Sequence, residues 1–174
     1  HRLDAALLAT PAESPEITEL EVFAEPLLAA IPEGHELMKR DPLQETALAD
    51  ELLVLAEGHC LANQALAACG TKHGVRSGLQ GSMQAATLET LVNLVAAGYG
   101  VTLIPALARE ALERRGIIVR PLAGRPVRSI RLASRPGFPR PQALRALERV
   151  IREAVAGHCE QPGERAPKRA ESRQ

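Results

Sequence analysis

The order of the apolar segments predicts an α/β fold. Short apolar runs typical of buried strands alternate along the chain with helical segments of about ten or more residues, the arrangement of a parallel sheet with right-handed crossovers. The composition agrees with a folded protein, since 45% of the 174 residues are hydrophobic and 24% are charged. This length suits one ordinary domain or two small ones.

Four strands and one helix are predicted in the first half of the chain. The predicted strands are residues 3–8, 20–23, 27–31 and 52–55. Pro26 separates the second strand from the third, and Gly58 ends the fourth. Residues 61–69 (LANQALAAC) are rich in Ala and Leu and contain no helix breaker. They predict a short helix that ends at Gly70.

The second half of the chain continues the alternation. A helix is predicted after Thr87, a good N-cap residue, and Gly98 and Gly100 end it. Its apolar face comprises Leu88, Leu91, Val92, Val95 and Ala96. A strand over 101–104 and a helix from Pro105 to about Arg115 follow. The remaining elements are strands over 117–119 and 130–133 and a final helix from Pro141 with the face Leu144, Leu147, Ile151 and Val155.

The predicted elements divide into two domains and a tail. Residues 1–23 open with a strand that no earlier element covers, and residues 129–157 return to it. We therefore expect these two segments to form a discontinuous domain that is incomplete in this sequence. Residues 24–128 would form a continuous second domain. Residues 158–174 are expected to be a disordered tail, because the sequence from Glu160 onward lacks large apolar residues.

Composition and missing motifs exclude several classes of protein. The 21 basic and 21 acidic residues give zero net charge, which is not the electrostatic signature of a free-standing DNA-binding domain. No apolar run approaches the roughly 18 residues of a membrane span, and no signal peptide opens the chain. We therefore expect a cytoplasmic protein with no membrane partner. Zinc-site spacings, phosphate loops and nucleophile elbows are lacking, so neither metal, cofactor nor enzymatic activity is expected.

Cys60 is the candidate reactive residue. It follows Gly58-His59, at the point where a predicted strand gives way to a predicted helix. Backbone N–H groups at a helix N-terminus stabilise negative charge, and a protonated His59 would add to this effect. Because the thiolate is the nucleophile toward peroxide, Cys60 is suited to forming a sulfenic acid.

Cys69 is the candidate partner of Cys60, and its spacing is informative. A helix of nine residues rises about 13.5 Å and places the two side chains on opposite faces. A disulfide requires Cα atoms about 4.4–6.8 Å apart. The two cysteines cannot bond while the helix persists, so oxidation would have to unwind it. This coupling of chemistry to folding is what a switch requires.

Three segments of the sequence resemble one family. The segments GHCLANQALAAC (58–69), ATLETLVNLVAAGYGVTLIPALA (86–108) and RPGFPRPQAL (135–144) together resemble the regulatory domain of the peroxide-sensing LysR-type transcription activators. The resemblance extends over about residues 3–156. It implies two Rossmann-like α/β subdomains of periplasmic-binding-protein type, the first of them discontinuous.

The resemblance also implies roles and partners. Cys60 would be the peroxidatic cysteine, Cys69 the resolving cysteine, and His59 a possible support for the thiolate. Hydrogen peroxide would be the signal, and glutaredoxin or thioredoxin the reductant. The protein would be a homodimer or tetramer. Promoter DNA and RNA polymerase would be contacted only through the parent protein, because this chain contains no winged helix-turn-helix domain.

Two other functions remain open at this point. The chain could be a LysR-type effector domain that binds a small metabolite in the cleft between subdomains, with incidental cysteines. It could also be a thiol peroxidase, which would need rapid recycling by a reductant. Of the remaining candidates, Cys159 is predicted to be a spectator, and His35 and His73 to be exposed loop residues. The basic run 125–131 is predicted to be a solvated strand edge.

Overall fold

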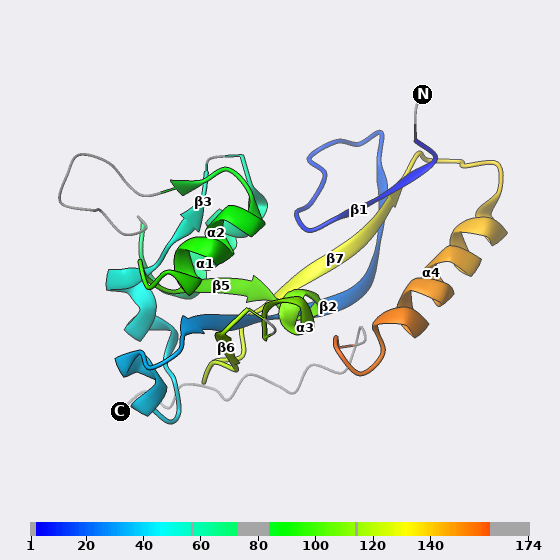
Figure 1. Ribbon diagram of the computed structural model, residues 1–174. Helices are drawn as coiled ribbons and strands as arrows, with labels where there is room; N and C mark the ends of the chain where they lie inside the picture. Colours follow the sequence, from blue (N-terminus) through cyan, green and yellow to red (C-terminus); the bar gives the residue numbers. More distant parts are fainter. Residues whose placement is uncertain (1–2, 57, 73–83, 114, 161–174) are drawn as a thin grey trace, which may run out of the picture. The chain divides into compact units, whose positions relative to one another are not determined.

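The computed structural model describes residues 3–56, 58–72, 84–113 and 115–160. The chain divides into two compact units, His1–Ala24 with Ser129–Gln174 and Glu25–Arg128. Two strands, β2 (Thr18–Pro32) and β7 (Val127–Ser134), are continuous from one unit into the other (Figure 1). The strand order β1-β7-β2-β5 makes these two strands neighbours in one sheet.

The first unit combines three strands and one helix. β1 (Ala5–Leu8) pairs antiparallel with β7, with Ala6 opposite Ala133. The helix α4 (Pro141–Val155) begins at Pro141, as predicted. The small core of this unit comprises Val22, Phe23, Ile130, Leu132 and Val155, against which Leu144 and Ile151 pack. Leu147, which was predicted to lie on the buried face, is 43% exposed, because it lies about 60° around the helix from Leu144.

The second unit contains part of an antiparallel sheet and a separate pair of parallel strands. The second half of β2 pairs antiparallel with β5 (Thr102–Pro105) and with β6 (Ile117–Arg120), so that Ala29 lies opposite both Leu103 and Arg120. The short strands β3 (Val54–Leu55) and β4 (Gln84–Ala85) pair in parallel. The prediction of a parallel sheet was therefore wrong for the main ladders. The order of elements predicts alternation, but strand direction depends on where each connection returns.

β2 corrects a second prediction, because it is one strand of 15 residues where two were expected. Pro26 lies at the point where the partners of β2 change: the N–H of Leu27 donates to the carbonyl of Pro126, and the ladder with β5 begins at Leu27. A proline removes one backbone donor, which disrupts a strand only where a ladder needs that donor.

The predicted helices are present with small shifts. α1 (Cys60–Ala68) and α2 (Leu88–Ala96) are followed by Gly70 at φ +67° and Gly98 at φ +80°, the left-handed conformation that ends helices. Oγ1 of Thr87 accepts from the N–H of Thr90 at 3.1 Å, which confirms the N-cap. The segment from Pro105 is a 3₁₀ turn, η3 (Ala106–Ala108), followed by α3 (Arg109–Glu113). The 3₁₀ segments η1 (Glu36–Lys39) and η2 (Glu45–Glu51) were not predicted.

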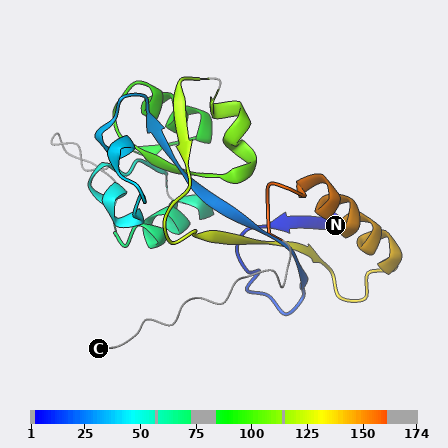
Figure 2. The ribbon, with the colours of Figure 1, turned by 90° about the horizontal axis from the view of Figure 1, so that it is seen from below.

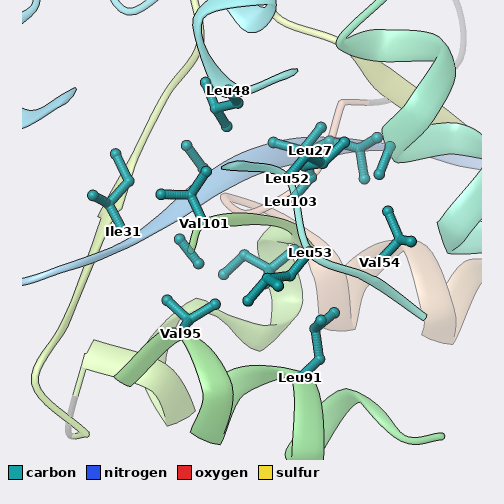
Figure 3. Close-up of a cluster of buried hydrophobic side chains, with 14 of the residues drawn as sticks. Leu27, Ile31, Leu48, Leu52, Leu53, Val54, Leu91, Val95, Val101 and Leu103 are labelled. Atoms are coloured by element: carbon teal, nitrogen blue, oxygen red, sulfur yellow. The ribbon is translucent and has the colours of Figure 1, made fainter. Parts of the chain in front are cut away.

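The second unit has a large aliphatic core. Side chains from β2, η2, β3, α2 and β5 meet in it (Figure 3). The labelled members are Leu27, Ile31, Leu48, Leu52, Leu53, Val54, Leu91, Val95, Val101 and Leu103. All ten are at most 3% exposed, and Cys69 belongs to the same core.

The ordered chain continues past the predicted start of the tail. Ala24 and Glu160 form an antiparallel bridge, with each backbone N–H bonded to the other's carbonyl. Residues 158–160 are thus part of the first unit. Backbone hydrogen bonds attach this polar segment to Ala24, although its composition predicted a tail. Residues 161–174 lie outside the described residues. Within the part of the chain that the structure describes, no helix is long and apolar enough to span a membrane.

Candidate functional site

Cys60 is the first residue of α1. Gly58, at φ +93°, makes the turn that precedes the helix, and His59 is the N-cap residue with extended backbone angles. The N–H of Ala62 donates to the carbonyl of His59 at 3.0 Å, which closes the first turn. His59 is exposed and its side chain forms no capping bond, whereas Cys60 is partly buried. The thiol therefore lies at the helix end where aligned peptide dipoles favour negative charge.

Cys69 is the C-cap residue of the same helix and lies in a different environment. It is 1% exposed and belongs to the aliphatic core of the second unit. Burial, and secondarily the negative charge of Glu45, raise the pKa of the Cys69 thiol to about 11. At neutral pH this side chain is a neutral, enclosed thiol.

The helix separates the two sulfur-bearing residues. Cys60 and Cys69 stand at opposite ends of α1, about 13.5 Å apart along the axis and about 180° apart around it. All three cysteines of the chain lie among the described residues, and none of them is in a disulfide. The α-helix on which the predicted separation depends is therefore present, and it must be disrupted before the two thiols can meet.

Glu45 is a charged neighbour of Cys69 that the sequence did not reveal. It is the first residue of η2, which packs against α1. Its Oε1 accepts a hydrogen bond from the backbone N–H of Gly124 at 2.6 Å. Glu45 and Gly124 are 79 positions apart in the sequence, which explains why no local pattern could indicate this contact.

Two other predictions are corrected by ion pairs. His35 was expected to be exposed, but its side chain is 16% exposed and Nε2 lies 2.9 Å from a Glu51 oxygen. Arg128, in the run predicted to be solvated, lies 2.7 Å from the carboxylate of Glu25, which is 1% exposed. Both pairs join different segments of the chain, and such pairing cannot be predicted from composition.

The remaining candidates belong to the other unit or lie outside the described residues. Cys159 is partly buried and packs against the core of the first unit, with its backbone N–H bonded to the carbonyl of Val155. His73 lies outside the described residues. Among the described residues, no three His, Cys, Asp or Glu side chains are grouped so as to bind a metal ion.

Comparison with known sequences identifies close relatives. The family model described as "LysR substrate binding domain" matches residues 1–156. The chain is 43% identical over 157 residues to a "Probable hydrogen peroxide-inducible genes activator" of Mycobacterium avium, covering 88% of this chain and 50% of that protein. It is 39% identical over 160 residues to the "DNA-binding transcriptional dual regulator OxyR" of Escherichia coli K12, covering 90% and 52%. The chain thus spans about half the length of these curated relatives.

Solved structures give the same result. The reduced form of OxyR from Neisseria meningitidis superposes with a TM-score of 0.79 at 28% identity, covering 91% of this chain and 76% of that one. Another reduced form of OxyR gives 0.72 at 37% identity, covering 90% and 73%. An oxidized form gives 0.70 at 39% identity, covering 90% and 74%.

The comparisons confirm the predicted resemblance and the α/β fold of periplasmic-binding-protein type. The relatives are named as gene regulators and not as enzymes, which agrees with the prediction of a non-enzymatic domain. The curated relatives, the solved OxyR structures and the family match over residues 1–156 lead to one assignment. This chain belongs to the LysR substrate-binding domain family, in which it is similar to OxyR and to proteins named as hydrogen peroxide-inducible genes activators.

Proposed function

We propose that this chain is the peroxide-sensing part of a transcription regulator, switched by a reversible disulfide between Cys60 and Cys69. The observation that carries the proposal is the position of these residues at the two ends of α1, one partly exposed and one buried. The names of the relatives, which describe hydrogen-peroxide-inducible activators, support it.

The first step would occur at Cys60. Its thiolate attacks one oxygen of hydrogen peroxide, the S–O bond forms as the O–O bond breaks, and hydroxide leaves and is protonated to water. The sulfur is oxidised to a sulfenic acid. Cys60 lies at the N-terminus of α1, where aligned peptide dipoles favour negative charge, and the neighbouring His59 would support the reactive sulfur.

The second step would require α1 to unwind. The thiolate of Cys69 attacks the sulfenic sulfur of Cys60, an S–S bond forms and hydroxide leaves. Because the bond cannot be accommodated by the intact helix, the disulfide traps the unwound segment. A dithiol reductant of the glutaredoxin or thioredoxin class would return the switch to the helical form in the cytoplasm.

The parent protein would transmit this change. The interface within a homodimer or tetramer of the regulator would change when α1 unwinds. A separate domain would then bind promoter DNA differently and contact RNA polymerase differently. Because this chain has zero net charge, we expect that other domain to supply the positive charge that binds DNA.

A second candidate function rests on the name of the matched family, "LysR substrate binding domain". A small metabolite would then be the signal, and the cysteines would be incidental. The two candidates differ in what peroxide does. The switch predicts rapid loss of two thiols per chain and slow turnover, whereas a metabolite sensor predicts no selective thiol loss.

The test is a peptide map after stoichiometric hydrogen peroxide. We expect a crosslink between the peptides that contain Cys60 and Cys69. Cys60→Ser should abolish it, while Cys69→Ser should leave a sulfenic acid on Cys60 that a carbon nucleophile such as dimedone traps. Cys159→Ser is the matched control, and should leave the crosslink intact because Cys159 packs in the other unit. A disulfide that still forms in the Cys60→Ser chain would refute the assignment.

A further inference from the structure

The C-terminal end of α1 lies against the N-terminal end of η2. α1 packs on both η2 and β3, and a Cβ placed on Gly70 would lie 4.0 Å from Cγ2 of Thr46. Cys69 directly precedes Gly70 in the chain, and Glu45 directly precedes Thr46. Since Cys69 is 1% exposed, its thiol is enclosed where the two elements meet.

The carboxylate of Glu45 is held by the loop between β6 and β7. Its Oε1 accepts from the N–H of Gly124 at 2.6 Å, and the N–H of Ala123 donates to the carbonyl of Leu43 at 2.9 Å. A Cβ at Gly124 would lie 2.6 Å from the same Oε1, so only glycine allows this contact without a shift. A neutral backbone group thus fixes the carboxylate in place.

The other charged side chains on the neighbouring segments are exposed or paired, so their charges affect the Cys69 thiol less than the charge of Glu45. α1 and β3 carry no charged residue. On η2, Asp50 is exposed and Glu51 pairs with His35. Lys72, three residues after Cys69, is exposed. Glu45 is the group whose charge adds to burial in raising the pKa of Cys69.

We infer that Glu45 is a positioning residue for the disulfide step. Its carboxylate, fixed against Gly124, keeps the buried Cys69 as an unreactive thiol until α1 unwinds. The inference rests on the proposed Cys60–Cys69 switch. A fixed negative charge beside the sulfur opposes formation of the thiolate, which is the form that attacks peroxide or a sulfenic acid. Unwinding removes Cys69 from both the burial and the charge. Glu45 thereby adds to burial in favouring one order of reaction, with peroxide reacting at Cys60 first.

The experiment uses Glu45→Gln, which removes the charge but keeps an oxygen to accept from Gly124. In a chain that also carries Cys60→Ser and Cys159→Ser, Cys69 is the remaining thiol, and the ultraviolet absorbance of its thiolate reports its titration. We expect Glu45→Gln to move the titration midpoint to lower pH and to raise the rate of alkylation of Cys69 by iodoacetamide at pH 8 several-fold. Asp50→Asn, which removes the same charge from the exposed side of η2, should change neither.

Two outcomes would overturn the role of Glu45. One is an unchanged midpoint in a Glu45→Gln chain whose circular dichroism shows a native fold. The other is an equal shift in Glu45→Asp, which keeps the charge, since the effect would then be merely structural. The titration uses no peroxide, so it tests Glu45 separately from the switch. An unaltered chain that forms no Cys60–Cys69 disulfide with peroxide would overturn the proposed function itself, and with it the disulfide step that Glu45 would serve.

Discussion

At the scale of single residues, the chain buries a charged side chain, and its sequence does not indicate that burial. Glu25 lies on β2, is 1% exposed, and accepts from Nε of Arg128 at 2.8 Å and from the backbone N–H of Leu107 at 3.1 Å. These two partners come from two other segments of the second unit. A buried carboxylate is tolerated only when it is paired and hydrogen-bonded, so each partner is needed.

The Glu25–Arg128 pair predicts a strong effect of removing one partner. Arg128→Met leaves the buried carboxylate without its cation, and we expect it to lower the free energy of unfolding by about 3–5 kcal/mol. Urea denaturation measures this change. Arg109→Met is the matched control, because Arg109 pairs with Glu113 at the surface, where such pairs contribute about 0.5 kcal/mol. Equal losses in the two variants would show that Glu25 is not held by Arg128.

At the scale of elements, α1 links the chemistry of the two cysteines to the fold. Its sequence predicted the helix, and the left-handed Gly70 ends it as expected. The N–H of Thr71 donates to the carbonyl of Leu66 at 3.1 Å, which completes the C-terminal cap. What the sequence did not indicate is that Cys69 lies in the core. Cys69 belongs to the core that also contains Leu48 of η2, a 3₁₀ segment that the sequence did not predict.

The buried thiol at the end of α1 predicts a pH dependence. The pKa of Cys69 is about 11 in the folded chain against an ordinary value of 9.0, so between these pH values the folded chain keeps a proton that the unfolded chain releases. Stability is therefore insensitive to this group below about pH 9 and falls as pH rises from about 9 to 11, by roughly 2–3 kcal/mol in total.

The measurement is the free energy of unfolding between pH 8 and pH 11, compared with Cys69→Ala. The other titrating groups are common to both chains and cancel in the difference. We expect the stability of the unaltered chain to fall more steeply than that of Cys69→Ala over this range. Parallel curves would mean that the Cys69 thiol ionises equally easily in both states.

At the scale of the whole molecule, the chain consists of two units that share two long strands. β2 and β7 each contribute residues to both units (Figures 1 and 2). Each unit nevertheless has its own core, a small one of five buried residues around Phe23 and a large aliphatic one around Leu103. Cys60 and Cys69 both belong to the unit with the large core.

This division predicts where oxidation acts. If the disulfide unwinds α1, hydrogen exchange followed by mass spectrometry should show loss of amide protection in peptides that cover 58–72. Peptides that cover α4, in the first unit, should keep their protection because their core contains neither Cys60 nor Cys69. Cys60→Ser treated with peroxide is the control. Protection retained in 58–72 after the disulfide has formed would contradict an unwinding switch.

The sequence by itself determined the local structure and the candidate chemistry. Apolar periodicity predicted α2 and α4, and Ala and Leu content without a breaker predicted α1. Capping residues such as Thr87 and Gly70 marked helix ends, because these signals act within one or two helical turns. The spacing of Cys60 and Cys69 along one helix also follows directly from the chain. Only the tertiary structure decided the direction of strand pairing, the continuity of β2 through Pro26, and the partners of Glu25 and Glu45. These features depend on contacts between segments tens of residues apart, where free energy comes from burial and long-range hydrogen bonds that no local pattern records.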